Sequence, residues 1–130
     1  LTGGHTMTLA VREVVTPTFT FVPKLQGTDL CCALTGTADL VAVEPLQDFL
    51  KELREDVARL RPPRVEVDVR ALLFINSSCL KAFVNLVFFL REAEHTPLLE
   101  FVTDGKLTWQ ERALAPLRRM SPSTVSIRIL

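Results

Sequence analysis

The sequence lacks several features that mark common functional classes. It has no excess of either charge, since 15 basic and 15 acidic residues give a formal net charge of +0 at pH 7. General nucleic-acid binding needs a basic stripe that neutralises phosphates, so this balance argues against nucleic acid as a partner. It has no long hydrophobic run either: the most apolar stretch, residues 83–90, contains Asn85. A membrane-spanning helix needs about 20 apolar residues, so no membrane span is expected.

Cysteine is scarce and is not arranged for metal binding. The three cysteines are Cys31, Cys32 and Cys79, with no C-x-x-C or Cys/His spacing among them. Neither a disulfide framework nor a metal site is therefore expected, and unpaired cysteines favour a reducing, cytoplasmic setting. The chain also lacks a P-loop, a G-x-G-x-x-G and a zinc motif, so no cofactor is predicted.

A catalytic base is also hard to find. A serine or cysteine nucleophile needs a base within reach, and the chain has two histidines, His5 and His95. His95 follows the far end of the helix that Ser77 opens, about 25 Å away at 1.5 Å per residue. We therefore predict a module that is not an enzyme. The competing hypothesis is an enzyme that uses Ser77 or Cys79 with a base from another subunit.

The chain does have periodic segments, strand-like and helix-like, in a number that suits one domain. Its 130 residues indicate a single domain over residues 7–130, with residues 1–6 a cloning remnant or a disordered tail. Alternating or apolar runs predict strands at 18–22, 30–34, 65–69, 98–102 and 125–129. Helical spacing predicts helices over 45–60 and from about Ser78 to Glu94. Thr108 to Glu111 fits a capping box, and the helix that follows is expected to kink or split at Pro116.

The order of these segments is strand, strand, helix, strand, helix, strand, helix, strand. Strands that alternate with helices imply mostly parallel pairing, after an antiparallel hairpin at the start. The predicted fold class is therefore α/β, with a mixed, mostly parallel sheet and about three helices mainly on one face.

The most informative motif is Asn76-Ser77-Ser78-Cys79, between the strand at 65–69 and the long helix. A hydroxyl there lies at the amino end of a helix, where free N–H groups and the helix dipole favour an anion. The bland alternative is that Asn76 or Ser77 is only an N-cap.

Residues 65–80 resemble the centre of a STAS domain, in which an apolar strand ending in Asp is followed by Asp-Ser-Ser/Thr-Gly-Leu opening a helix. Roughly residues 29–130 share the resemblance, and the sequence looks like an Asn-Ser-Ser variant subgroup. Two positions depart from the pattern: Asn76 replaces the Asp and Cys79 replaces the Gly. The resemblance implies a bacterial regulator similar to anti-sigma factor antagonists. Its implied partners are a histidine-kinase-like serine kinase that is also the anti-sigma factor, and a serine phosphatase.

The resemblance also implies a phosphoacceptor. The first hydroxyl of the motif is Ser77, and Ser78 is the second choice. Asp68, Asn76 and Cys79 are expected to form the environment of the phosphorylation site. Asp68 alone suggests a metal ligand, a base or a residue that satisfies local backbone groups, and we favour the last. The alternative to a switch is a constitutive scaffold subunit of a regulatory complex, in which Ser77 only caps the helix.

The long helix predicts a contact surface. On a helical wheel, the core side gathers Leu80, Phe83, Leu86, Val87 and Leu90. The opposite stripe gathers Ser78, Lys81, Asn85, Phe88 and Glu92. Phe88 in this stripe is either an ordinary exposed phenylalanine or the anchor for a partner or a second copy of the chain.

Overall fold

The computed structural model describes residues 8–130; the expectations for residues 1–6 and for His5 lie outside these residues. Its elements in chain order are β1 (Val14–Val15), β2 (Phe19–Gln26), β3 (Asp29–Ala38), the 3₁₀ turn η1 (Leu40–Ala42), α1 (Val43–Leu60), β4 (Arg64–Ile75), α2 (Ser77–Glu92), β5 (Leu98–Thr103), α3 (Thr108–Met120) and β6 (Val125–Ile129).

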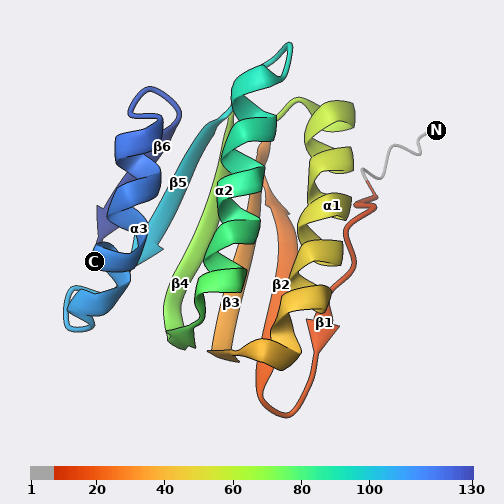
Figure 1. Ribbon diagram of the computed structural model, residues 1–130. Helices are drawn as coiled ribbons and strands as arrows, with labels where there is room; N and C mark the ends of the chain where they lie inside the picture. Colours follow the sequence, from red (N-terminus) through yellow and green to blue (C-terminus); the bar gives the residue numbers. More distant parts are fainter. Residues whose placement is uncertain (1–7) are drawn as a thin grey trace.

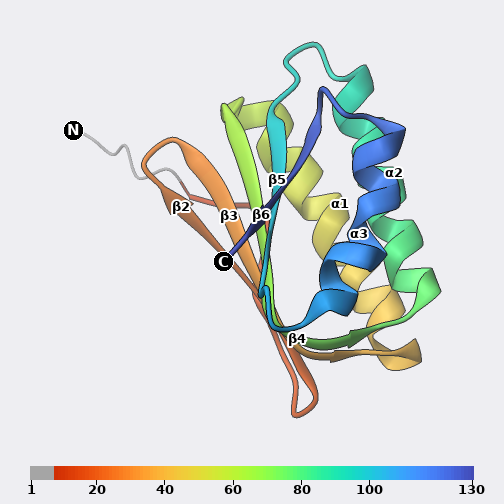
Figure 2. The same ribbon diagram turned by 90° about the vertical axis from the view of Figure 1, so that its left-hand side faces the viewer.

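These strands form one sheet whose spatial order is the chain order, β1 to β6. β1, β2 and β3 pair antiparallel, and β3 to β6 pair parallel. Parallel crossovers are almost always right-handed, so three crossovers that advance in one direction place their helices on one face. Figures 1 and 2 show α1, α2 and α3 on the same side of the sheet, with α2 between the other two. The predicted α/β fold class is confirmed.

The N-terminal hairpin is longer than the sequence pattern predicts. β2 and β3 pair from Phe19 with Gly36 to Gln26 with Asp29, around a two-residue turn. Gly27 in that turn has φ of +64°, a conformation that glycine adopts without steric strain. β1, which pairs only two residues with β2, is not predicted from the sequence.

The core lies between the sheet and the helices, as the wheel of α2 predicts. Phe83, Leu86, Val87 and Leu90 are fully buried, and Leu80 is half-buried. The Phe83 ring meets Phe101 of β5 edge-on, with ring centroids 5.6 Å apart. The parallel strands and the helix that joins them are therefore held by one apolar cluster.

A buried carboxylate attaches the N-terminal segment to α1. Asp56 is fully buried, and its two oxygens accept the backbone N–H groups of Ala10 and Val11, each at 2.8 Å. Arg59, one turn later, donates to the same carboxylate at 2.6 Å. The segment before β1 thus packs along α1 instead of leaving the domain.

The capping box predicted at the start of α3 is wrong, and so is the predicted split of this helix. Leu107 is the N-cap and no side chain in residues 8–130 caps the helix, so Thr108 to Glu111 is not a capping box. Gln110 instead accepts the Asp104 N–H at 2.8 Å and donates to the Val69 and Leu72 carbonyls at 2.7 and 2.9 Å. This buried amide joins α3 to β4. Pro116 lies inside the helix, which is not split there, so of the two predicted outcomes only a kink remains a prediction.

Within residues 8–130, no helix combines the length and the apolar character needed to cross a membrane.

Candidate functional site

The candidate site is the point at which β4 passes into α2. The Asn76 N–H donates to the Ala38 carbonyl at 2.9 Å, which holds the end of β4 against the end of β3. Asn76 itself is extended, with φ of −84° and ψ of 169°, and its side-chain oxygen accepts the Cys79 N–H at 2.8 Å. The Leu80 N–H donates to the Asn76 carbonyl at 3.0 Å, the first helical bond. Asn76 is therefore the N-cap of α2, as its amide side chain suits.

Ser77 is the first residue of α2, so the hypothesis that Ser77 caps the helix is wrong. Its side chain and that of Ser78 are exposed. The backbone N–H groups of these two serines have no acceptor among residues 8–130, because a helix leaves its first N–H groups without an internal partner. No acidic residue lies in the first turn of α2. The local field and the free donors therefore favour an anion at Ser77.

Cys79 faces inward. It is fully buried, and its thiol lies 3.8 Å from the Asp39 carbonyl oxygen in the connection after β3. Burial raises the pKa of the Cys79 thiol, the nearby Asp39 raises it further, and the hydrogen bond at Asn76 opposes both. A buried thiol with a raised pKa is a poor nucleophile. Cys79 thus supports the helix start from beneath and leaves the outer surface to the serines.

Asp68 is not brought to the serines. It lies in β4, seven residues before Ile75, on the order of 20 Å along the strand. Its carboxylate accepts the Arg70 backbone N–H at 3.0 Å and pairs with the Arg70 guanidinium at 2.8 Å. The placement of Asp68 around the phosphorylation site is therefore incorrect. Its role matches the favoured alternative, a residue that satisfies local backbone groups.

The outer stripe of α2 is exposed along its whole length. Its members are Ser78, Lys81, Asn85, Phe88 and Glu92. The Phe88 side chain is 48% exposed, and the Arg91 guanidinium lies over its ring at 5.8 Å from the centroid. The structure therefore leaves Phe88 outside the core and available for contact.

Four exposed apolar side chains, here called the apolar collar, lie on the two segments that meet next to the serines, and the sequence analysis missed them. Leu40 and Val41 of η1, with Leu73 and Phe74 at the end of β4, are each 48% to 79% exposed. Phe74 pairs with Thr37 next to the start of η1, so the two pairs belong to neighbouring segments. The available signal was the run Leu72 to Ile75, in which the strict alternation of β4 gives way to apolar residues on both faces.

The other candidate chemistry is not assembled at this site. Within residues 8–130, no group of three or more His, Cys, Asp or Glu side chains could hold a metal ion. The His95 ring nitrogen contacts the Pro62 carbonyl oxygen at 3.0 Å, beyond the C-terminal end of α2. The one described histidine therefore lies at the opposite end of the helix from Ser77.

Comparison by sequence gives no relative: no protein-family model matches, and no curated protein matches either. Comparison by structure finds similar proteins. An anti-sigma factor antagonist from Mycobacterium paratuberculosis superposes with a TM-score of 0.65 at 19% identity, over 88% of this chain and 90% of that one. A chain in the complex of the diguanylate cyclase SiaD with its activator SiaC, from Pseudomonas aeruginosa, superposes with a TM-score of 0.61 at 15% identity, over 92% of this chain and 99% of that one.

These likenesses extend over nearly all of the described residues, so they bear on the whole domain and not only on the β4–α2 junction. At under 20% identity they show a shared fold.

Proposed function

We propose that this STAS-like domain is a partner-binding regulator without enzymatic activity, and that phosphorylation of Ser77 switches its partner binding. The observation that carries the proposal is the position of Ser77. It is exposed in the first turn of α2, beside two N–H groups that have no acceptor among residues 8–130, and next to the segments that carry the apolar collar. The two structural neighbours add support. One is an anti-sigma factor antagonist, and the other complex pairs a diguanylate cyclase with its activator.

The physical argument for a switch rests on two opposite effects of one phosphate. Phosphorylation adds about −1.5 to −2 charges, which the free N–H groups and the helix dipole stabilise by up to about 2 kcal/mol. The fold therefore tolerates the modification. A partner pressed against the collar desolvates the same charge, and a buried charge without a counter-ion costs several kcal/mol.

The partners we propose are a histidine-kinase-like serine kinase that acts as the anti-sigma factor, and a serine phosphatase that reverses the modification. Ser77 is the proposed acceptor. Ser78 is the second choice: its side chain is exposed too, but it is the second hydroxyl of the motif. The stripe that starts at Ser78 and includes Phe88 is the proposed extension of the contact surface. A second copy of the chain is an alternative occupant of this stripe.

The test is phosphorylation followed by binding. The full chain is incubated with ATP and each serine kinase of this class from its own genome, and intact mass shows whether one phosphate is added. Peptide mapping and the variants Ser77→Ala and Ser78→Ala identify the acceptor. Ser77→Ala is expected to abolish the addition and to keep the partner bound, whereas Ser77→Asp is expected to bind weakly. Wild-type binding by both Ser77 variants would contradict the switch.

The second candidate is a constitutive scaffold subunit. Its support is that Asn76, and not Ser77, makes the structural hydrogen bond, so the fold is complete without any modification. In that case the same partner binds wild type, Ser77→Ala and Ser77→Asp alike, while substitutions in the collar still weaken binding. An enzyme that uses Cys79 has no such support, because the thiol is buried.

A further inference from the structure

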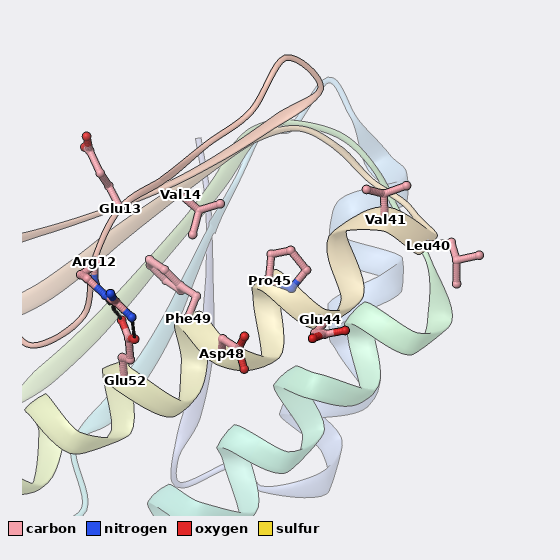
Figure 3. Close-up of a pocket in the computed structure, with 10 residues that line it drawn as sticks. All are labelled: Arg12, Glu13, Val14, Leu40, Val41, Glu44, Pro45, Asp48, Phe49 and Glu52. Carbon is pink, nitrogen blue, oxygen red and sulfur yellow. Dashed lines mark hydrogen bonds and ion pairs between the residues drawn. The ribbon is translucent and has the colours of Figure 1, made fainter.

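A groove runs between the N-terminal segment and the first half of α1 (Figure 3). Its volume is about 730 Å³. One end is closed by the ion pair between Arg12 and Glu52, with 2.7 Å between the charged groups. The other end opens at Leu40 and Val41, so the groove meets the apolar collar.

The α1 side of the groove carries a row of like charges. Glu44, Asp48 and Glu52 are spaced by four residues, which places them on successive turns of one helix face. Glu52 is neutralised by Arg12. In the described chain, no cation forms an ion pair with Glu44 or Asp48.

The stability of α1 explains only some of the acidic residues in this row. Glu44 lies in the first turn of α1, where a negative charge favours the helix dipole. Asp48 lies one turn later, and like charges at this spacing destabilise a helix. Arg12, which pairs with Glu52, also attracts Asp48 electrostatically, so the domain balances the row only in part. Further cations that lie along Glu44 and Asp48 would complete the balance.

The groove also offers apolar area. Leu40 and Val41 are the most exposed large apolar side chains of the described chain, at 79% and 73%. Val14 of β1 and Pro45 of α1 are half-buried and line the groove (Figure 3). An apolar edge beside a row of negative charges is complementary to an amphipathic helix. Such a helix would carry cations one turn apart on one face and apolar residues on the next.

We propose that this groove binds a basic amphipathic helix of a partner protein, with lysines or arginines along Glu44 and Asp48 and an apolar side chain against Leu40 and Val41. The proposal rests on the partner-binding role argued above, but it does not depend on phosphorylation. It names a second contact region, continuous with the collar around Ser77 and separate from the stripe on α2.

The test uses two synthetic helix-forming peptides with one apolar pattern, one carrying lysines and the other glutamates at its polar positions. Binding to the full chain is followed by fluorescence anisotropy at low and at physiological salt. The groove variant is E44Q/D48N. The control E55Q/E94Q removes the same charge at two exposed carboxylates that lie outside the groove. Thermal unfolding checks that both variants fold.

The lysine peptide is expected to bind and the glutamate peptide to fail. E44Q/D48N is expected to weaken binding of the lysine peptide about fivefold, and the control less than about twofold. In two-dimensional NMR spectra, the lysine peptide is expected to shift the amides of Val14, Val41 and Asp48. Equal effects of the two variants, or shifts confined to other surfaces, would overturn the proposal.

The outcome is separable from the phosphorylation proposal. E44Q/D48N leaves Ser77 and its surroundings intact, so the variant is expected to accept phosphate like wild type. If E44Q/D48N loses binding of the lysine peptide but is phosphorylated normally, the groove is supported as the binding site of the peptide. A chain that is never phosphorylated but binds the lysine peptide through Glu44 and Asp48 contradicts the switch and keeps the groove.

Discussion

Asn76 and Cys79 are joined by the hydrogen bond that begins α2, with 2.8 Å between the Asn76 side-chain oxygen and the Cys79 backbone nitrogen. The bond assigns the structural role at this helix start to the asparagine. It also turns the Cys79 side chain into the core and leaves the two serines between them exposed.

The structural role of Asn76 and the proposed regulatory role of Ser77 can be distinguished by the free energy of unfolding of their variants. Asn76→Ala is expected to lower the free energy of unfolding by about 1 kcal/mol, because the Cys79 N–H loses its acceptor. Ser77→Ala is expected to change it by less than about 0.5 kcal/mol, because the exposed Ser77 hydroxyl makes no hydrogen bond with residues 8–130. Asn76→Asp keeps the acceptor and is the control. Urea unfolding measures all three, and equal losses for the two alanine variants would contradict the assignment.

Phe88 is predicted to act in binding and not in folding. Phe88→Ala should lower the free energy of unfolding by no more than about 1 kcal/mol, mainly through the contact with Arg91. It should weaken partner association by more than about 1 kcal/mol if the ring is an anchor. The matched control is Phe83→Ala on the buried face of the same helix, which should cost about 3–5 kcal/mol of stability. Calorimetry and a binding titration measure both, and unchanged association for Phe88→Ala would remove Phe88 from the interface.

The cysteines are predicted to be unreactive in the folded chain. All three are buried, and burial raises the pKa of each thiol, so little thiolate forms at neutral pH. A thiol reagent added to native protein should label Cys32 and Cys79 only at the rate of unfolding. Urea-unfolded protein, labelled in parallel, gives the rate of free thiols. Rapid labelling of Cys79 in the native protein would support the hypothesis of an enzyme that depends on this cysteine.

The pair formed by Asp68 and Arg70 predicts an acid-dependent contribution to stability. Burial alone would raise the pKa of Asp68, but the hydrogen bonds and the charge of Arg70 outweigh it and hold this pKa below the ordinary value of 3.8. A carboxyl with a lowered folded pKa stabilises the fold above its unfolded pKa, and the effect is lost as pH falls through the folded value.

At neutral pH, Arg70→Ala is therefore expected to lower the free energy of unfolding by up to about 1 kcal/mol. The difference from wild type should vanish at acid pH, once Asp68 is protonated in both proteins. Arg119→Ala is the control, because Arg119 is exposed and makes no ion pair with residues 8–130. Unfolding curves across the acid range measure the difference, and a difference that persists at acid pH would show that it does not depend on Asp68.

Periodicity predicted most of the fold because the core selects one face of each element. The apolar spacing of α2 and the alternation at Val65, Val67 and Val69 each identified a buried face. The capping box at Thr108 failed for a tertiary reason. Gln110 is held by the Val69 and Leu72 carbonyls of β4, and no local pattern reveals an acceptor about 40 positions away.

The sequence by itself determined the order of the three helices and of all strands except β1, the buried face of α2 and the place of the serines at a helix start, because these follow from local periodicity. Only the tertiary structure decided which residues surround Ser77. It brought Leu40 and Val41 beside the end of β4 and kept Asp68 far away along the strand. It also placed the row from Glu44 to Glu52 across a groove from the N-terminal segment. Such neighbours depend on strand register and helix packing, which act between residues that are distant in the chain.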